Sequence, residues 1–208
     1  MTTNAGFNRF APRAAAAIGP NRWDVLLLPL VIGVLFLITW GSGKMNVPYV
    51  LGTPIPISLD PGSLPEYALR TVLRMTLAML GSLAFALLYG SLAAKSEAAG
   101  RVLIPLLDIL QSIPILGFLS ISVVGFVELL PGSMLGPELA AVFAIFTSQA
   151  WNLTFSYYAS LRMIPRDLYE VSRMLKLSPW QQFFRLEAPH AMPGLIWNMM
   201  MSVAGGWF

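Results

Sequence analysis

The sequence contains no cysteine and a single histidine, His190. Without cysteine the chain can form neither a disulfide nor a thiolate metal site, and one histidine beside Pro189 does not supply the clustered ligands of a metal centre. Charged residues are also scarce, at 11% of the chain against 56% hydrophobic residues. This balance is too apolar for an ordinary soluble domain, so we expect the chain to fold in a lipid bilayer.

Motifs for catalysis are missing as well. Gly43-Lys44 is followed by Met45, and Ile38 stands where a phosphate-binding loop would have its first glycine. The Ser/His/Asp set, the HExxH helix and the paired acids of a membrane hydrolase are also absent from the sequence. The basic residues are not gathered into one patch, which argues against a nucleic-acid partner. We therefore expect neither an enzyme nor a bound cofactor or metal.

What the sequence does contain is long stretches without Asp, Glu, Lys or Arg. A helix of roughly 20 such residues crosses the hydrocarbon core of a bilayer, and four stretches are long enough, while a fifth runs to the last residue. The stretches are 25–43, 75–94, 109–127, 139–161 and 191–208. The predicted fold class is all-α: a polytopic transmembrane helical protein with about five spans, which we expect to be incomplete at its C-terminus.

The basic residues between these stretches predict the topology. Lys and Arg cluster before the first stretch, between the second and third, and between the fourth and fifth, which places those segments in the cytoplasm by the positive-inside rule. We expect a multi-pass protein of a bacterial inner membrane with its N-terminus in the cytoplasm. The predicted parts are a cytoplasmic tail 1–24, a first span 25–43, an extracytoplasmic loop 44–66, and a core 67–208 with a cytoplasmic loop 162–190.

Three residues in or near the spans are candidates for a translocation path. Arg74 lies with Arg70 on one helix face near the outer end of the second stretch, where both could extend to the membrane interface or Arg74 could attract anionic solutes. Pro114 should kink the third helix or follow a short initial segment. Gln111, just before it, could face the path or hydrogen-bond a neighbouring helix.

The cytoplasmic loop 162–190 has the pattern of two amphipathic helices joined by a turn. Pro165 can open the first, with Asp167 in its first turn and apolar residues at helical spacing. Ser178 and Pro179 fit the N-cap and first position of the second, whose apolar set comprises Trp180, Phe183, Phe184 and Leu186. Taken alone, such a pair could simply lie on the lipid surface.

This loop resembles the EAA loop of ABC importer permeases, whose pattern is EAA, three residues, G, nine residues and I-x-L-P. Glu170-Val171-Ser172 stands at the EAA positions, Lys176 at the glycine, Leu186 at the isoleucine and Ala188-Pro189 at L-P. The family glycine allows a turn with positive φ, which lysine adopts only at a cost, so the turn type is left open here. Within the superfamily, the sequence is most similar to the nitrate, sulfonate and taurine group.

The resemblance implies the type I permease fold and a role in binding-protein-dependent import driven by ATP on a separate subunit. Implied partners are that ATP-binding subunit, an extracytoplasmic solute-binding protein and a second permease copy or fused half. The alternative is a membrane scaffold or assembly protein whose loop binds another partner. The residues expected to couple to the ATPase are Arg166, Glu170, Val171, Ser172, Lys176, Leu177, Leu186 and Pro189.

Overall fold

The computed structural model describes residues 57–205 and, before them, residues 29, 31–33, 36, 39, 40, 43 and 48. Most of the predicted first span 25–43 and the whole tail 1–24 therefore lie outside the described residues. The chain divides into two compact units, Met1–Trp40 and Gly41–Phe208. In the first unit the described residues are helical, and Thr39 Oγ1 donates a hydrogen bond of 2.9 Å to the carbonyl of Phe36.

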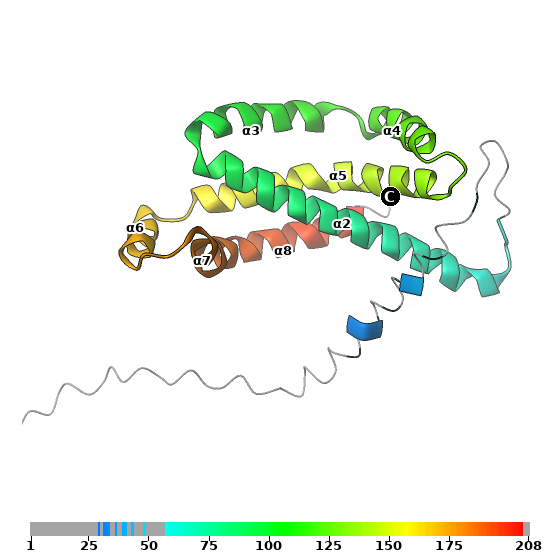
Figure 1. Ribbon diagram of the computed structural model, residues 1–208, viewed down its shortest axis with the longest axis horizontal. Helices are drawn as coiled ribbons and strands as arrows, with labels where there is room; N and C mark the ends of the chain where they lie inside the picture. Colours follow the sequence, from blue (N-terminus) through cyan, green and yellow to red (C-terminus); the bar gives the residue numbers. More distant parts are fainter. Residues whose placement is uncertain are drawn as a thin grey trace, which may run out of the picture. The chain divides into compact units, whose positions relative to one another are not determined.

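The second unit is helical nearly throughout its described residues (Figure 1). An isolated antiparallel bridge between Pro48 and Ser133 is its recorded β pairing. In chain order its elements are η1 (Pro61–Ser63), α2 (Leu64–Lys95), α3 (Glu97–Ser112), α4 (Ile115–Leu129), α5 (Leu135–Arg162), α6 (Arg166–Met174), α7 (Pro179–Gln182), the π-helical η2 (Phe183–Glu187) and α8 (Ala188–Gly205).

Helix α2 begins before the predicted stretch and is longer than a bilayer requires. Its 32 residues extend over about 48 Å at 1.5 Å per residue, against a hydrocarbon core of about 30 Å. The helical segment Pro61–Lys95 is the one described helix that is both long and apolar enough by itself to cross a membrane. At its far end Ser96 is extended and its side chain caps α3 by accepting from the backbone N–H of Ala99, so the chain turns sharply there.

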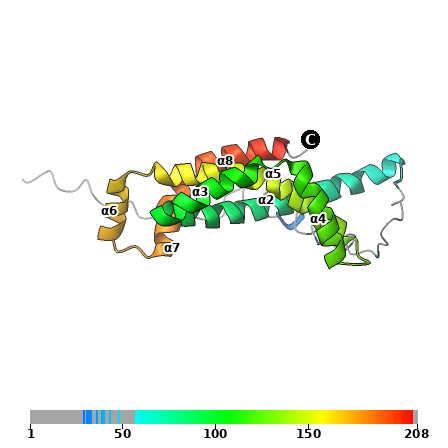
Figure 2. The same ribbon diagram turned by 90° about the horizontal axis from the view of Figure 1, so that it is seen from above.

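The third predicted stretch is not a single kinked helix, and the segment before Pro114 is not short. The chain is extended at Ile113, with φ −75° and ψ 124°, and Pro114 precedes α4 as its N-cap residue. A proline disfavours the helical conformation of the residue before it, which explains the break. The helix that ends there is α3, with 16 residues starting at Glu97, and α4 leaves in a different direction (Figure 2).

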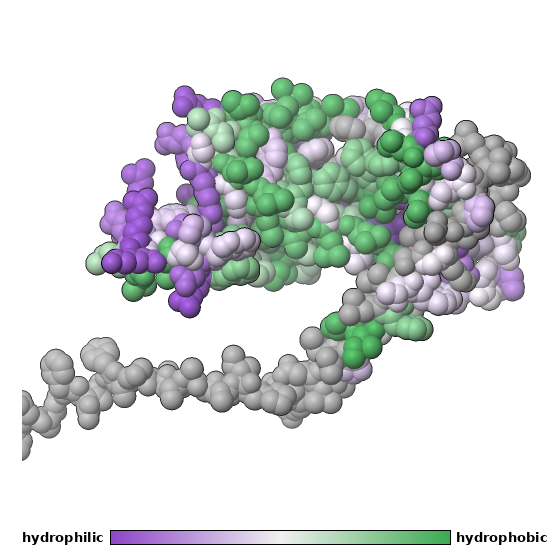
Figure 3. Space-filling view, in the orientation of Figure 1, coloured by the Kyte–Doolittle hydropathy of each residue, from purple (hydrophilic) through white to green (hydrophobic). Residues whose placement is uncertain are grey.

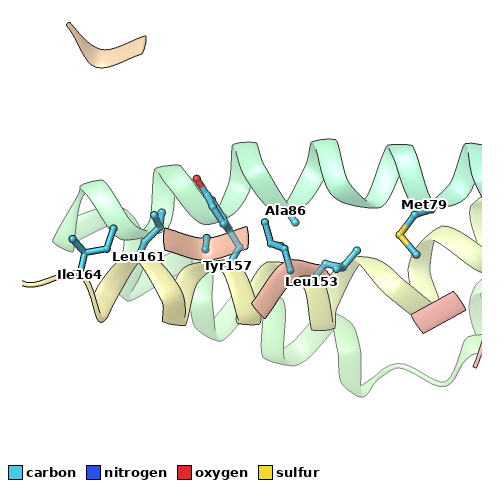
Figure 4. Packing of buried hydrophobic residues seen from close by; sticks show 8 residues of the cluster. Met79, Ala86, Leu153, Tyr157, Leu161 and Ile164 are labelled. Atoms are coloured by element: carbon cyan, nitrogen blue, oxygen red, sulfur yellow. The ribbon is translucent and has the colours of Figure 1, made fainter. Parts of the chain in front are cut away.

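The core lies where α2, α5 and α8 pack together, and Figure 4 shows its buried side chains. Tyr157 is fully buried at its centre, and its hydroxyl is 3.1 Å from Ser91 Oγ on α2. Helix α2 approaches closely because it has glycine at position 90: a Cβ there would lie 2.7 Å from Cδ1 of Tyr157. On the face seen in Figure 3, the unit is apolar across its middle, with hydrophilic residues gathered near its ends, as expected for helices in lipid.

Candidate functional site

The first helix of the cytoplasmic loop forms as the sequence predicts. Helix α6 starts after Pro165 and has Asp167 in its first turn and Arg173 in its last, which suits the helix dipole. It runs across the bundle axis beyond the end of α5 (Figure 2). Ser172 is buried and donates to the carbonyl of Tyr169, whereas Glu170 is exposed on the outer side. One face of the helix thus packs against the protein, and the other is exposed.

The exposed face of this loop is unusually apolar. Val171 is 48% exposed, Met174 81%, Leu175 66% and Trp180 72%. Phe184 is also exposed and stacks on Trp180, with ring centroids 6.0 Å apart. Large apolar side chains grouped at a polar end of a protein mark a surface that contacts a partner or lipid.

The turn after α6 has the conformation for which the family uses glycine, although Lys176 occupies the position. Lys176 has φ 50°, and within the described residues it is the one non-glycine residue with positive φ. Its N–H donates to the carbonyl of Arg173 and the N–H of Leu177 to that of Ser172, at 2.9 and 3.1 Å. These two bonds form a Schellman motif. The turn type left open by the sequence is therefore the glycine type, held by hydrogen bonds that offset the cost of a left-handed lysine.

The second loop helix starts as predicted but does not end before the last helix. Ser178 caps α7 through a capping box with Gln181, and the chain continues without a break through η2 into α8. Pro189 has no N–H to donate to Arg185, so an α-helical register would leave that carbonyl without its usual partner. The π-helical turn Phe183–Glu187 lies directly before this proline, where π-bulges adapt a helix to such defects. Of the apolar set, Phe183 and Leu186 pack on the core, while Trp180 and Phe184 are exposed.

A buried carboxylate that the sequence reasoning missed ties this loop to α2. Glu187 is 0% exposed, and its Oε2 lies 2.9 Å from Nζ of Lys95. Its Oε1 accepts a hydrogen bond of 3.0 Å from Nε2 of Gln182. The sequence held one signal of this pair: Glu187 is an acidic residue among the apolar positions that follow Phe183. A charge buried at such a position needs a partner of opposite charge.

These groups border a polar cavity of about 440 Å³ between the ends of α2 and α5, α6 and η2. Arg162, Arg166 and Arg173 line it together with Lys95, so its rim is basic. Tyr169 also lines it, and burial, together with the nearby charge of Glu187, raises the pKa of its phenol. The tyrosine is therefore neutral at physiological pH.

The three candidates for a translocation path each have a different structural setting. Arg74 on α2 forms a two-pronged ion pair with Glu138 on α5, which includes a 2.6 Å bond from Nη2 to Oε1, so its charge is compensated instead of standing free at the interface. Gln111 is exposed and donates to Asp108 one turn earlier. Pro114 caps α4. Within the described residues no hydrogen bond or ion pair joins these three, and their role in a path stays a prediction.

Apolar helices with a polar loop at one end are typical of a helical membrane protein. Residues 86–208 match the family model of the binding-protein-dependent transport system inner membrane component, and the chain belongs to this family. As the loop resemblance indicated, it is an ABC importer permease similar to the nitrate and sulfonate group.

Three relatives illustrate that similarity. The nitrate import permease protein NrtB of Synechocystis is 25% identical, over 88% of this chain and 69% of its own length. The bicarbonate transport system permease protein CmpB of Synechococcus elongatus is 26% identical, over 91% and 73%. SsuC of Bacillus subtilis, whose name assigns it to aliphatic sulfonates transport, is 27% identical, over 88% and 65%.

Proposed function

We propose that this chain is the membrane-spanning subunit of an ATP-driven importer for a small anion, and that α6 with its following turn is where a separate ATPase subunit docks. The observation that carries the proposal is the coincidence of three features in one loop. The family motif positions, the Schellman turn at Lys176 and the exposed apolar face around Val171 and Met174 all lie on the same short segment. A lipid-bound helix would need the apolar face but not the motif.

In this proposal the chain crosses the membrane about five times, with the tail 1–24 and α6 in the cytoplasm. Helix α5 has 28 residues and α8 has 18, or about 42 and 27 Å of helix. Both are compatible with spanning a core of about 30 Å when helices tilt or flanking residues extend to the interface. The gathering of hydrophilic residues at the end that holds α6 supports a cytoplasmic loop there (Figure 3).

The loop is connected to the spans in a way that can transmit movement of a docked ATPase. Helix α7, η2 and α8 form one continuous helical path from Pro179 to Gly205. The buried pair of Glu187 and Lys95 joins the same path to the end of α2. Displacement of α6 by the partner would therefore act on α8 directly and on α2 through the ion pair, while ATP itself stays on the partner subunit.

The anion and the remaining partners rest on the family. The named relatives are a nitrate permease, a bicarbonate permease and one assigned to sulfonates, and each of these solutes carries an oxyanion group. A solute-binding protein outside the membrane and a second permease copy complete the proposed importer, because transport paths form at interfaces between repeated units. The bilayer is the remaining partner.

Charge reversal at Glu170 tests the docking surface. The full-length protein would be co-expressed with the ATPase subunit encoded nearest to it, and co-purification from detergent would be measured. Glu170→Arg should lower recovery of the ATPase at least tenfold, whereas Glu128→Arg, at an exposed acid on α4, should leave it unchanged. Equal recovery with both variants would refute the docking surface. A loop that binds lipid vesicles but no ATPase would favour the scaffold alternative, in which Trp180 and Phe184 lie on the membrane.

A further inference from the structure

A row of small polar side chains runs along the face of α5 that meets α8. On α5 they are Ser148, Asn152, Ser156 and Ser160, each four residues after the previous one, and such spacing places them on one helix face. On α8 the corresponding row is Gly194, Asn198 and Ser202, again at intervals of four. The two rows form a polar seam between two helices that otherwise expose apolar side chains, and this seam is not part of the loop described above.

At the end of the seam nearer α6, the two helices are in close contact. A Cβ on Gly194 would lie 3.2 Å from Oγ of Ser160 and 3.3 Å from Oγ of Ser156. Asn198 Nδ2 donates to Ser156 Oγ at 2.9 Å and to the carbonyl of Gly194 at 3.1 Å. One interhelical bond and two bonds within the helices, the second being Ser160 Oγ to the carbonyl of Ser156 at 2.8 Å, account for the polar side chains in this half of the seam.

Further from α6, the seam opens into a pocket of about 180 Å³. Its lining carries no charged side chain and consists of Ser148, Asn152, Asn198, Met201, Ser202 and Gly205. Next to it, Gln149 is 1% exposed, donates to the carbonyl of Ser202 at 3.4 Å, and has its Oε1 buried without a hydrogen-bond partner. The volume is sufficient for a small ion with a few water molecules.

Packing does not explain Asn152. It is exposed in the middle of a helix, and within residues 57–205 its side chain makes no recorded hydrogen bond. An amide that faces hydrocarbon without a hydrogen-bond partner is unfavourable, so polar groups at this depth face a bundle interior or a water-filled path. The amide of Asn152 is therefore placed where water or a polar solute can reach it.

We infer that this pocket is a solute contact of the import path, in which Asn152 binds a small oxyanion through neutral hydrogen-bond donors. The inference rests on the proposed transport function. Asn152 offers two N–H donors, and the Ser202 hydroxyl lines the same pocket. Asn198 already uses its amide donors on α5 and α8, so its carbonyl oxygen faces a hydrating water or a protonated oxygen of the solute.

Neutral donors suit a transit site better than a fixed cation does. An ion must bind well enough to enter a path and weakly enough to leave it, and a charge-assisted hydrogen bond is roughly twice as strong as a neutral one. Arg74, the cation that the sequence offered as a candidate contact for anions, is already paired with Glu138. The structure therefore assigns solute selection to amide and hydroxyl groups of the α5 and α8 seam.

A single introduced thiol tests this assignment, because the chain has no cysteine of its own. The full transporter, with its ATPase and binding protein, would be reconstituted in vesicles carrying N152C, with L88C as control at an exposed apolar position of α2. A small charged thiol reagent should modify N152C at least tenfold faster than L88C and should abolish uptake. In M201C, which places a thiol in the same pocket and keeps Asn152, nitrate or bicarbonate in excess should slow the modification at least threefold.

Two further variants separate a solute contact from a structural role. Asn152→Leu should lower ATP-dependent uptake of nitrate or bicarbonate at least tenfold while ATPase co-purification stays normal, and Asn152→Gln should retain donors and raise the KM of uptake more than it lowers its maximal rate. The inference is overturned if N152C reacts as slowly as L88C, if no oxyanion slows the modification of M201C, or if Asn152→Leu transports normally. Loss of ATPase association in the unmodified protein would instead refute the proposed function.

Discussion

The contribution of the ion pair between Arg74 and Glu138 to stability can be predicted, and two single variants and the double variant test the prediction. Glu138 is 4% exposed and Arg74 is 31% exposed. Removing one partner of a buried pair costs about 3–5 kcal/mol, because the other charge stays buried without compensation. Since solvent reaches part of the arginine and screens the interaction, we expect about 2–3 kcal/mol for Arg74→Met. Replacing both partners, as Arg74→Met with Glu138→Gln, should be nearly neutral.

Thermal unfolding of the purified protein in detergent measures this difference. A loss of 1 kcal/mol lowers the Tm by roughly 2–4 °C in a protein of this size, so Arg74→Met should lower it by about 4–12 °C. The double variant should unfold within about 3 °C of the unmodified protein, so the coupling energy in a double-mutant cycle should be close to the sum of the losses of the two single variants, Arg74→Met and Glu138→Gln. Losses that simply add in the double variant, or an unchanged Tm for Arg74→Met, would refute the reasoning.

The same double variant also tests the sequence-based hypothesis that Arg74 attracts anions. Because the double variant keeps the fold but removes both charges, its uptake rate separates the two roles of the arginine. Normal uptake of nitrate or bicarbonate assigns Arg74 a purely structural role between α2 and α5. A loss of at least tenfold at normal Tm assigns it a direct contact with the solute.

Two backbone predictions follow from the same structure. Lys176→Gly should raise the Tm by about 2–4 °C, because relieving a left-handed non-glycine residue is worth about 1 kcal/mol. Lys176→Ala keeps a Cβ at φ 50° and should bring no gain in Tm. Equal Tm values for the two variants would contradict strain at this turn. Gly136→Ala should destabilise the protein by about 1–3 kcal/mol, because its Cβ would lie 2.9 Å from the carbonyl oxygen of Phe126. Gly125→Ala, with no atom within 4 Å, is the matched control, and a Tm loss equal in both would show that the close contact is not the cause.

The local signals in the sequence were sufficient for the loop. Pro165, Asp167, Ser178 and Pro179 act within a few residues of themselves, so their patterns predicted both helix starts, and the structure confirms these. The absence of charge likewise located the α2, α5 and α8 helices, since a bilayer excludes charge over a fixed length. Such rules work because cause and effect lie close together in the chain.

Long-range pairing could not be predicted in this way. Glu138 appeared to belong to an outer loop until α5 placed it against Arg74, which lies 64 residues earlier. The same is true of Glu187, which pairs with Lys95 on α2. In each case the acid is buried because a base from α2 lies beside it, and a single sequence does not show which residues the fold brings together.

The two acids mark different ends of α2, and this limits how the bundle can move. Arg74 is held to α5, whereas Lys95 is held to the helical path that leads from the loop into α8. Under the proposed coupling, a displacement of the loop would act on the α6 end of α2, while the ion pair with Glu138 would hold its other part to α5. The seam between α5 and α8 lies between these two attachments, and at its end nearer α6 Gly194 lies against Ser156 and Ser160. Contacts between such small side chains bury little apolar surface, so in this proposal a moving loop would alter the seam and with it the pocket that contains Asn152.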